Sequence, residues 1–266
     1  MARNKSIIKL EGTLDGMTFF MKDGENLVKS QSTLSKNKIM TDSAFRRTRE
    51  NMREFGGASR VGKAFRESFS GISKTMADTY MGARINRVMK RINRNGTGLR
   101  GERDFNVVTF GDMLRGFEFN NKTPFDSQFT APSTPPVISG TRDLVTWVVP
   151  DFSIDSYVSI PDGATHLRLV LAAGYVSNYF YNVTLDSYVP DDESVNARGG
   201  VSYSTEIPLA GMVGSDTTLV VDLTAFGAIP ATSALFVGTG IIFYQQVNGA
   251  FYELAQGNAL KVAAFG

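Results

Sequence analysis

The segment 57–63 matches the glycine–lysine pattern of a phosphate-binding loop. It reads G-x-x-x-x-G-K, but Ala64 follows where a Ser or Thr would hold magnesium. Such a loop also follows a strand and opens a helix, so that backbone N–H groups surround the phosphates. The residues before Gly57 favour a helix instead. We therefore interpret the match as part of a helical segment and not as a nucleotide site.

Other catalytic and metal-binding chemistry lacks the residues that it needs. His166 is the only histidine and cysteine is absent, so neither a multi-histidine site nor a thiolate metal site can form. No G-x-S-x-G nucleophile motif occurs. Asp191, Asp192 and Glu193 follow Pro190 in an expected loop, without the spaced ligands of an EF-hand. We predict no catalytic, cofactor-binding or metal-binding residue, no small-molecule substrate and no enzyme activity.

Charge is the sequence property that does point to partners. Residues 1–104 hold 22 Lys and Arg against 11 Asp and Glu, whereas residues 105–266 hold 6 against 15. The balances are +11 and −9, which give the net charge of +2. Such a split favours binding to nucleic acid or to an acidic surface of a neighbouring copy, while a solvated helix face is the third interpretation. The candidate contacts are Arg46, Arg49, Arg53, Arg84, Arg87, Lys90, Arg91, Arg94, Asp191, Asp192 and Glu193.

Nucleic acid would bind to the segment 84–103. It carries seven basic residues, and Glu102 is its only acid. Neutralising phosphates with these cations would give salt-dependent binding. No aromatic RNA-binding motif, zinc-finger spacing or clear helix-turn-helix pattern accompanies them, and the acidic C-terminal part would repel a polyanion.

The basic residues lie in a segment, 41–95, that reads as helical. Thr41-Asp42-Ser43 offers an N-cap, and Gly56-Gly57 would end a first helix. The expected apolar face of that helix consists of Ala44, Phe45, Thr48, Met52 and Phe55.

A second helical run opens at Ser59 and stops at Asn95-Gly96. Its apolar stripe changes sides beyond Gly82, and two interpretations remain open. The run breaks near Gly71 or Gly82, because a mid-helix glycine costs about 1 kcal/mol relative to alanine. Alternatively it is one long helix with two apolar faces, each covered by a different partner. The two stripes are Val61, Phe65, Phe69, Ile72, Met76 and Tyr80, then Met81, Ile85, Val88 and Ile92.

The N-terminal residues predict three short strands, 6–13, 17–22 and 26–30, joined by turns at Asp15-Gly16 and Asp23-Gly24. The polar segment 31–40 is typical of a linker. A meander of this size is too small to be stable alone and must pack on something. It is either an arm that reaches a neighbouring subunit or a sheet that folds back on its own domain.

The C-terminal part favours an antiparallel β-sandwich. Short β-rich runs alternate with turns, and Asn248-Gly249 suits a two-residue hairpin turn. The predicted strands are 105–110, 113–119, 125–130, 144–149, 157–160, 166–173, 179–185, 201–209, 217–223, 234–246 and 251–262. We therefore expect an α+β protein with a β-meander and linker at 1–40, a basic helical segment at 41–104 and the sandwich at 105–266. A sub-boundary is expected at 130–136.

The sequence gives no export or membrane signal. The N-terminus lacks the apolar core of a signal peptide, and nowhere are there about 18 consecutive apolar residues. We expect cytoplasmic synthesis without Sec export, with the final location open, and no membrane span.

Several motifs resemble those of a family of uncharacterised bacterial proteins. The similar residues are Ile8-Lys9-Leu10-Glu11-Gly12-Thr13, Gly16-Met17-Thr18-Phe19-Phe20, the segment 47–56 and Gly163-Ala164-Thr165-His166. The resemblance covers the first 60 residues well and the remainder loosely. It implies an N-terminal β-hairpin region paired with a β-rich C-terminal region, and it brings no activity or cofactor.

Two functional hypotheses follow. The first is a non-enzymatic structural protein that self-assembles into a filament, tube, sheath or shell. The basic helices and the N-terminal β-arm of one copy would contact the acidic β-domain of the next. The alternative is a nucleic-acid-associated packaging or architectural protein that uses the basic helix.

Overall fold

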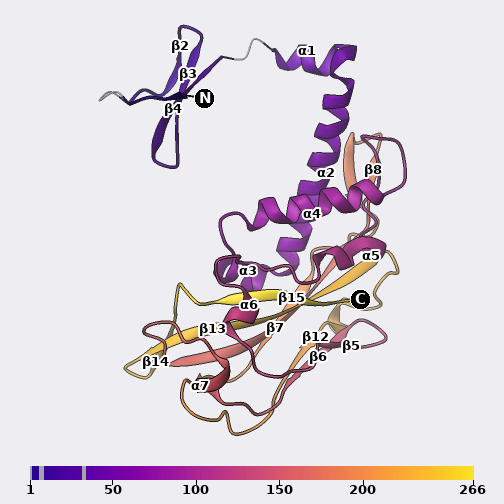
Figure 1. Ribbon diagram of the computed structural model, residues 1–266. Coiled ribbons are helices and arrows are strands. Elements are labelled where there is room, and N and C mark those ends of the chain that lie inside the picture. Colours follow the sequence, from indigo (N-terminus) through magenta and orange to yellow (C-terminus); the bar gives the residue numbers. More distant parts are fainter. Residues whose placement is uncertain (1, 6–8, 32–33) are drawn as a thin grey trace. The chain divides into compact units, whose positions relative to one another are not determined.

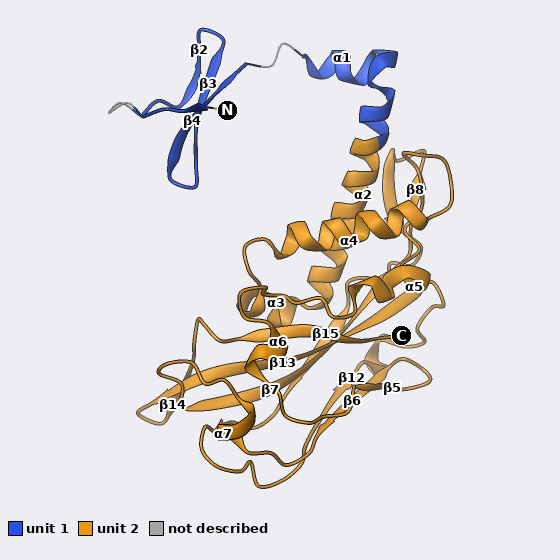
Figure 2. Ribbon diagram, in the orientation of Figure 1, with its two compact units in different colours: residues 1–50 blue, residues 51–266 orange. Residues whose placement is uncertain are grey.

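The computed structural model describes residues 2–5, 9–31 and 34–266, and the chain divides into two compact units, Met1–Glu50 and Asn51–Gly266 (Figure 2). The division falls inside a helix, whereas the sequence placed boundaries at 40/41 and 104/105. From Asn51 onward, the helical segment and the β-rich part thus belong to one unit.

The first unit is a small antiparallel sheet followed by short helices. Its strands lie in the order β1-β4-β3-β2, and tight turns at Asp15-Gly16 and Asp23-Gly24 have positive φ at both residues. The predicted strand 6–13 is wrong at residues 9–11, and residues 6–8 lie outside the described residues. The predicted linker contains a helical turn, α1, capped by Ser35. The elements are β1 (Ala2–Arg3), β2 (Gly12–Leu14), β3 (Met17–Lys22), β4 (Glu25–Ser30), α1 (Lys36–Thr41) and η1 (Ser43–Phe45).

The helix α2 (Arg46–Ser68) continues through Gly56 and Gly57, so the predicted helix end there is wrong. A Cβ at position 57 would lie 2.6 Å from the Phe105 and Tyr188 rings. Glycine is therefore required because α2 passes close to these rings, and it does not act as a C-cap. The chain then breaks twice, before α3 (Ser70–Met76) and before α4 (Met81–Asn95). The single long helix is therefore wrong, and the interpretation with breaks near the two glycines is confirmed.

The β-rich part forms two main antiparallel sheets. The larger has the order β10-β7-β13-β14, with β11 on β7 and β15 on β13, and the smaller has the order β12-β6-β5. A separate hairpin pairs β8 with β9. The strands are β5 (Val137–Ile138), β6 (Leu144–Val149), β7 (His166–Ser177), β8 (Tyr179–Asn182), β9 (Ser187–Pro190), β10 (Gly199–Tyr203), β11 (Ile207–Pro208), β12 (Thr217–Asp222), β13 (Ser233–Val247), β14 (Ala250–Glu253) and β15 (Ala259–Phe265).

The six-stranded sheet lies between the helices and the small sheet (Figure 1). One core contains Phe65 and Ile85 of the helices with Phe236 of β13. The other contains Trp147 of the small sheet with Leu169 of β7. Both faces of β7 are therefore buried, which explains its apolar run. The α+β fold class is confirmed.

The predicted strands 105–110 and 125–130 are wrong because single helical turns replace most of them, and 113–119 and 157–160 form only isolated bridges, at Glu118 and Val158. In α5 (Val107–Phe110) the Asn106 side chain accepts a hydrogen bond from the Thr109 N–H, a local cap that competes with a strand. Pro124 occupies the N-cap position of α6 (Phe125–Gln128), without a side-chain hydrogen bond. These turns bury aromatic residues in the two cores, so tertiary packing overrides their β propensity. The remaining turns are η2 (Gly111–Leu114), α7 (Ile154–Tyr157) and η3 (Thr224–Phe226).

In the part of the chain that the structure describes, no helix has the length and apolar character needed to cross a membrane.

Candidate interaction surfaces

One face of the N-terminal sheet carries apolar side chains that the described residues leave partly exposed, while Asn26 on the same face is buried and donates to the Leu10 carbonyl oxygen. Strand register places Leu14 beside Met17, and Phe19 beside Val28, all on the same face. Leu14 is 64% exposed and Met17 is 44% exposed. Among the described residues of this unit only Asn26 and Glu50 are buried, so the unit has no apolar core.

The opposite face of this sheet is more polar. Thr13 and Thr18 pair across β2 and β3 with their hydroxyl groups 3.2 Å apart. Phe20 on this face is covered by Lys29, whose ammonium nitrogen lies 5.5 Å from the ring centroid. The two faces thus differ: the exposed Leu14, Met17 and Met21 lie on the Phe19 face, whereas the other face carries Lys22 and Lys29 beside Phe20 and Leu27.

In the first unit, the predicted basic contacts already have partners. The Arg46 Nε lies 3.0 Å from a Glu50 carboxylate oxygen. Arg49 donates hydrogen bonds of 2.8 Å to the carbonyl oxygens of Ile39 and Asp42. Arg46 therefore pairs within α2, whereas Arg49 ties α2 to Ile39 of α1 and to Asp42.

Three further candidates form ion pairs within the second unit. Arg53 lies 3.1 Å from Glu102 and 3.3 Å from Asp186 at the β8–β9 hairpin. Arg84 lies 2.7 Å from Asp78 and also donates to two backbone carbonyls. Lys90 pairs with Glu54. Each of these cations already has an acidic partner in its own chain. Binding a nucleic acid or a neighbouring copy through them would require breaking that ion pair.

Glu54 is a buried structural anion that the sequence did not reveal. Its carboxylate accepts hydrogen bonds from Lys90, from Arg103 at 2.8 and 3.0 Å, and from the Gly101 N–H at 2.8 Å. Burial alone raises the pKa of Glu54, but the hydrogen bonds from Arg103, Lys90 and Gly101 outweigh it and lower the pKa to about 2. The group thus fixes α2 to α4 and to the segment after it. Nothing in the sequence distinguishes Glu54 from the other two acids of α2, Glu50 and Glu67.

Arg87, Arg91 and Arg94 are exposed and form no ion pair with any described residue. Together with Phe55 of α2 they line a groove of about 440 Å³. Phe55 and Met52, which the sequence predicted on the apolar face of a helix, are both exposed. The groove is thus lined by the apolar Phe55 and Ala83 and by three guanidinium groups without an ion-pair partner among the described residues.

The predicted acidic patch lies beside α2 of its own chain. Glu193 lines a depression of about 390 Å³ together with Arg60 and Lys63. Asp192 accepts a hydrogen bond from the Ser194 N–H, and hydrogen bonds from Ser194 lower the pKa of its carboxyl. Burial raises the pKa of Asp191. Asp191 and Glu193 are exposed and Asp192 is half-buried, while Glu193 shares its depression with Arg60 and Lys63 of α2.

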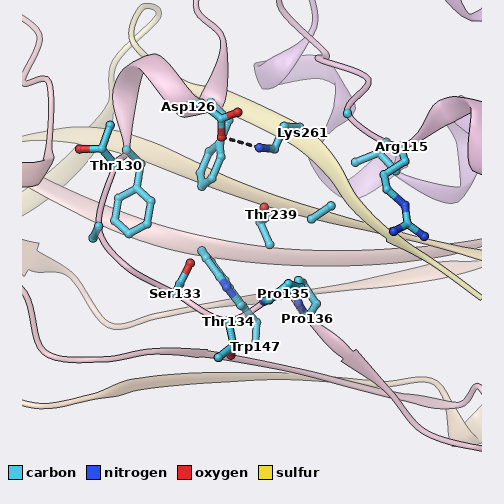
Figure 3. A pocket seen from close by; sticks show the side chains of 16 residues that line it. Arg115, Asp126, Thr130, Ser133, Thr134, Pro135, Pro136, Trp147, Thr239 and Lys261 are labelled. Carbon is cyan, nitrogen blue, oxygen red and sulfur yellow. Dashed lines mark hydrogen bonds and ion pairs between the residues drawn. The ribbon is translucent and has the colours of Figure 1, made fainter.

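A cavity of about 480 Å³ opens beside the segment 130–136, where Trp147, Thr239 and Lys261 line it (Figure 3). Asp126 is the only carboxylate of its lining and pairs with Lys261. A carboxylate pair for acid–base chemistry is thus missing from the lining. Within the described residues, no group of three His, Cys, Asp or Glu could hold a metal ion. The cavity offers aromatic rings, hydroxyl groups and one paired lysine.

Comparison with protein-family models, curated proteins and solved structures finds no match. The resemblance carried by the N-terminal motifs thus stays a prediction. The surfaces of this chain are therefore the basis for inferring its function.

Proposed function

We propose that this protein is a non-enzymatic structural protein that assembles with copies of itself into a filament, tube, sheath or shell. The observation that carries the proposal is the Phe19 face of the N-terminal sheet, where Leu14, Met17 and Met21 are exposed and the described residues of the unit bury no apolar side chain. A sheet of this size is marginally stable in water unless its apolar face is covered. A neighbouring copy supplies that cover.

Charge supports the choice of a copy as the neighbour. Residues 1–50 hold 10 Lys and Arg against 6 Asp and Glu, and the β-rich part of the same chain is acidic. Complementary potentials favour contact between these parts of different copies and fix its register. Because the two contact surfaces differ, the interface is heterologous and propagates unless its rotation closes a ring.

Nucleic acid is the second candidate partner, and the free guanidinium groups of Arg87, Arg91 and Arg94 favour it. Three exposed arginines on one helix would bind phosphates with a steep salt dependence. The internal pairing of Arg84 and Lys90 leaves fewer cations for this role than the sequence suggested.

Electron microscopy of purified, nuclease-treated protein tests the proposal. We expect regular polymers that form without nucleic acid. Particles that require nucleic acid and keep absorbance at 260 nm would favour the second candidate. Monodisperse monomers at high protein concentration would overturn self-assembly.

A further inference from the structure

Two polar side chains interrupt the face of the large sheet that packs on the small sheet. Val237 and Ile241 of β13 lie in the core between the two sheets, and alternation places Thr239 on the same face. Lys261 of β15 is the cross-strand partner of Thr239. A hydroxyl and an ammonium group thus stand at paired positions of this apolar face, where both line the cavity of Figure 3.

Two buried polar groups of this cavity lack a hydrogen-bond partner. Thr239 is 3% exposed and Trp147 is 2% exposed. Neither the Thr239 hydroxyl nor the Trp147 indole N–H forms a hydrogen bond with any described residue. Figure 3 shows the Thr239 hydroxyl between the Lys261 side chain and the Trp147 ring. Because most buried polar side chains in folded proteins are paired, these two groups indicate a site for a molecule that supplies their partners.

The size and the walls of the cavity fit a small organic molecule. Its volume of about 480 Å³ lies within the roughly 300–1,000 Å³ of small-molecule sites. The rings of Phe125, Phe129 and Trp147 form one aromatic group, with centroids 5.5, 6.4 and 6.3 Å apart. Pro135 and Pro136 add apolar surface that has no N–H donor. The lining therefore offers apolar surface next to the unpaired hydroxyl and N–H groups.

The charges of the lining favour a neutral ligand. Lys261 pairs with Asp126, which is the only carboxylate of the lining. Arg115, the other cation, lies 2.7 Å from Asp112. Since each charge is already balanced by its neighbour, a charged ligand would lose its hydration without gaining an unpaired counter-charge. The Lys261–Asp126 pair still offers donors and an acceptor to uncharged hydroxyl groups.

We propose that this cavity binds a neutral saccharide. Sugar hydroxyl groups both donate and accept hydrogen bonds, as the Thr239 hydroxyl, the Trp147 N–H and the Lys261–Asp126 pair require. The apolar C–H faces of a pyranose ring match the aromatic and proline side chains of the walls. The inference goes beyond the proposed self-assembly and does not depend on it.

The saccharide is bound and not cleaved. Glycoside hydrolysis commonly uses two carboxyl groups roughly 5–9.5 Å apart, and the lining contributes only that of Asp126. The site therefore adds recognition, without catalysis, to the proposed structural role.

Trp147 reports binding directly, because it is the only tryptophan of the chain and lines the cavity. Full-length protein is titrated with maltose, cellobiose, lactose and N,N′-diacetylchitobiose while the tryptophan emission is recorded. We expect a saturable change in emission with at least one of these neutral disaccharides. No saturable response to any of them would overturn the inference.

Two charged sugars test the preference for a neutral ligand. Glucuronate carries a carboxylate and glucosamine carries an ammonium group. We expect neither to bind more tightly than the best neutral disaccharide in the same titration. Tighter binding of either charged sugar would overturn the assignment of a neutral ligand.

Thr239→Val separates ligand binding from folding. It keeps the branched shape and removes a hydroxyl without a partner among the described residues, so we expect no loss of thermal stability. Saccharide affinity should fall by roughly three- to tenfold, because one neutral hydrogen bond is lost. Thr239→Ser keeps the hydroxyl and should retain most of the affinity. Thr218→Val makes the same change at an exposed site on β12 and should alter neither property.

Two outcomes for Thr239→Val would contradict the inference. Saccharide binding as tight as in the wild type would mean that the sugar binds elsewhere. A loss of thermal stability would mean that the hydroxyl has a structural partner, so the argument from an unpaired group would fail. A chain that binds saccharide in this way but stays monomeric would overturn self-assembly alone.

Discussion

The two units of the chain solve the problem of stability in different ways. Asn51–Gly266 buries two hydrophobic cores on opposite faces of one sheet and anchors its helices through the buried Glu54. Met1–Glu50 has four paired strands but no buried apolar side chain among its described residues. This difference is the basis of our proposal that the first unit gains stability from a neighbouring copy. Substitutions at matched positions in the two units test this contrast.

The largest contrast is expected between two phenylalanines. Phe65 is fully buried against Phe69, Phe119 and Phe236, so Phe65→Ala should lower the free energy of unfolding by about 3–5 kcal/mol. Phe19→Ala should leave that free energy unchanged in the monomer. Urea unfolding followed by fluorescence measures this, because Trp147 is the only tryptophan and lies in the larger unit. Equal losses for both variants would mean that the first unit shares the core.

Removal of the Glu54 carboxylate should cost nearly as much. Glu54→Ala leaves Lys90 and Arg103 without their buried partner, and breaking such a pair costs about 3–5 kcal/mol. The carboxylate Glu50 in the first unit, paired with Arg46 and Arg47 near the helix start, is the comparison. Glu50→Ala should change unfolding of the larger unit by less than about 0.5 kcal/mol.

The pH dependence of stability sharpens this second contrast. The pKa of Glu54 is about 2 in the folded protein and 4.5 when unperturbed. Its stabilising contribution is therefore fully present above pH 4.5 and is lost as the pH falls toward 2. Glu54→Gln should remove this part of the pH profile. A profile that is unchanged in Glu54→Gln would contradict the assigned ion network.

Adjacent glycines of α2 should respond in opposite directions. An added Cβ at Gly57 meets Phe105 and Tyr188 at 2.6 Å, so Gly57→Ala should destabilise the protein by about 1–3 kcal/mol. Nothing lies within 4 Å of a Cβ at Gly56, so Gly56→Ala should stabilise α2 by up to about 1 kcal/mol. Thermal unfolding of both variants measures the two changes in stability. Shifts of the melting temperature with the same sign would contradict the close approach of Phe105 and Tyr188 to Gly57.

The smallest effect is expected at two equivalent hairpin turns. Gly249 joins β13 to β14 with φ of 83°, and Gly24 joins β3 to β4 with φ of 79°. Alanine in this backbone region costs about 1 kcal/mol, and no atom crowds either site. Gly249→Ala should therefore lower unfolding stability of the larger unit by that amount, whereas Gly24→Ala should not affect it. The tryptophan signal again reports the difference.

Strands and turns with strong local signals were predictable from the sequence. The strands 144–149 and 234–246 and the Asn248-Gly249 turn agree closely with β6, β13 and the observed hairpin. The segment 105–130 was not predictable, because its aromatic residues pack from single helical turns and only the tertiary environment selects that conformation.

The interaction surfaces were predictable only in part. The N-terminal meander was expected to pack on a neighbour or on its own domain, and the register now shows which apolar side chains share a face. Net charge could not show that Arg53, Arg84 and Lys90 have acidic partners in their own chain, because Glu54 and Asp186 are distant from some of them in sequence. Alternation in β6 likewise could not show that its outer face stays uncovered.

Sedimentation velocity over a range of protein concentrations tests the central claim most directly. The account predicts that the full-length chain grows well beyond its monomer mass of 29.0 kDa with concentration. Phe19→Asp should remain a monomer, and Thr18→Asp on the opposite face of the same strand should still assemble. A wild-type chain that stays at the monomer mass throughout, or a Phe19→Asp variant that assembles normally, would contradict the account.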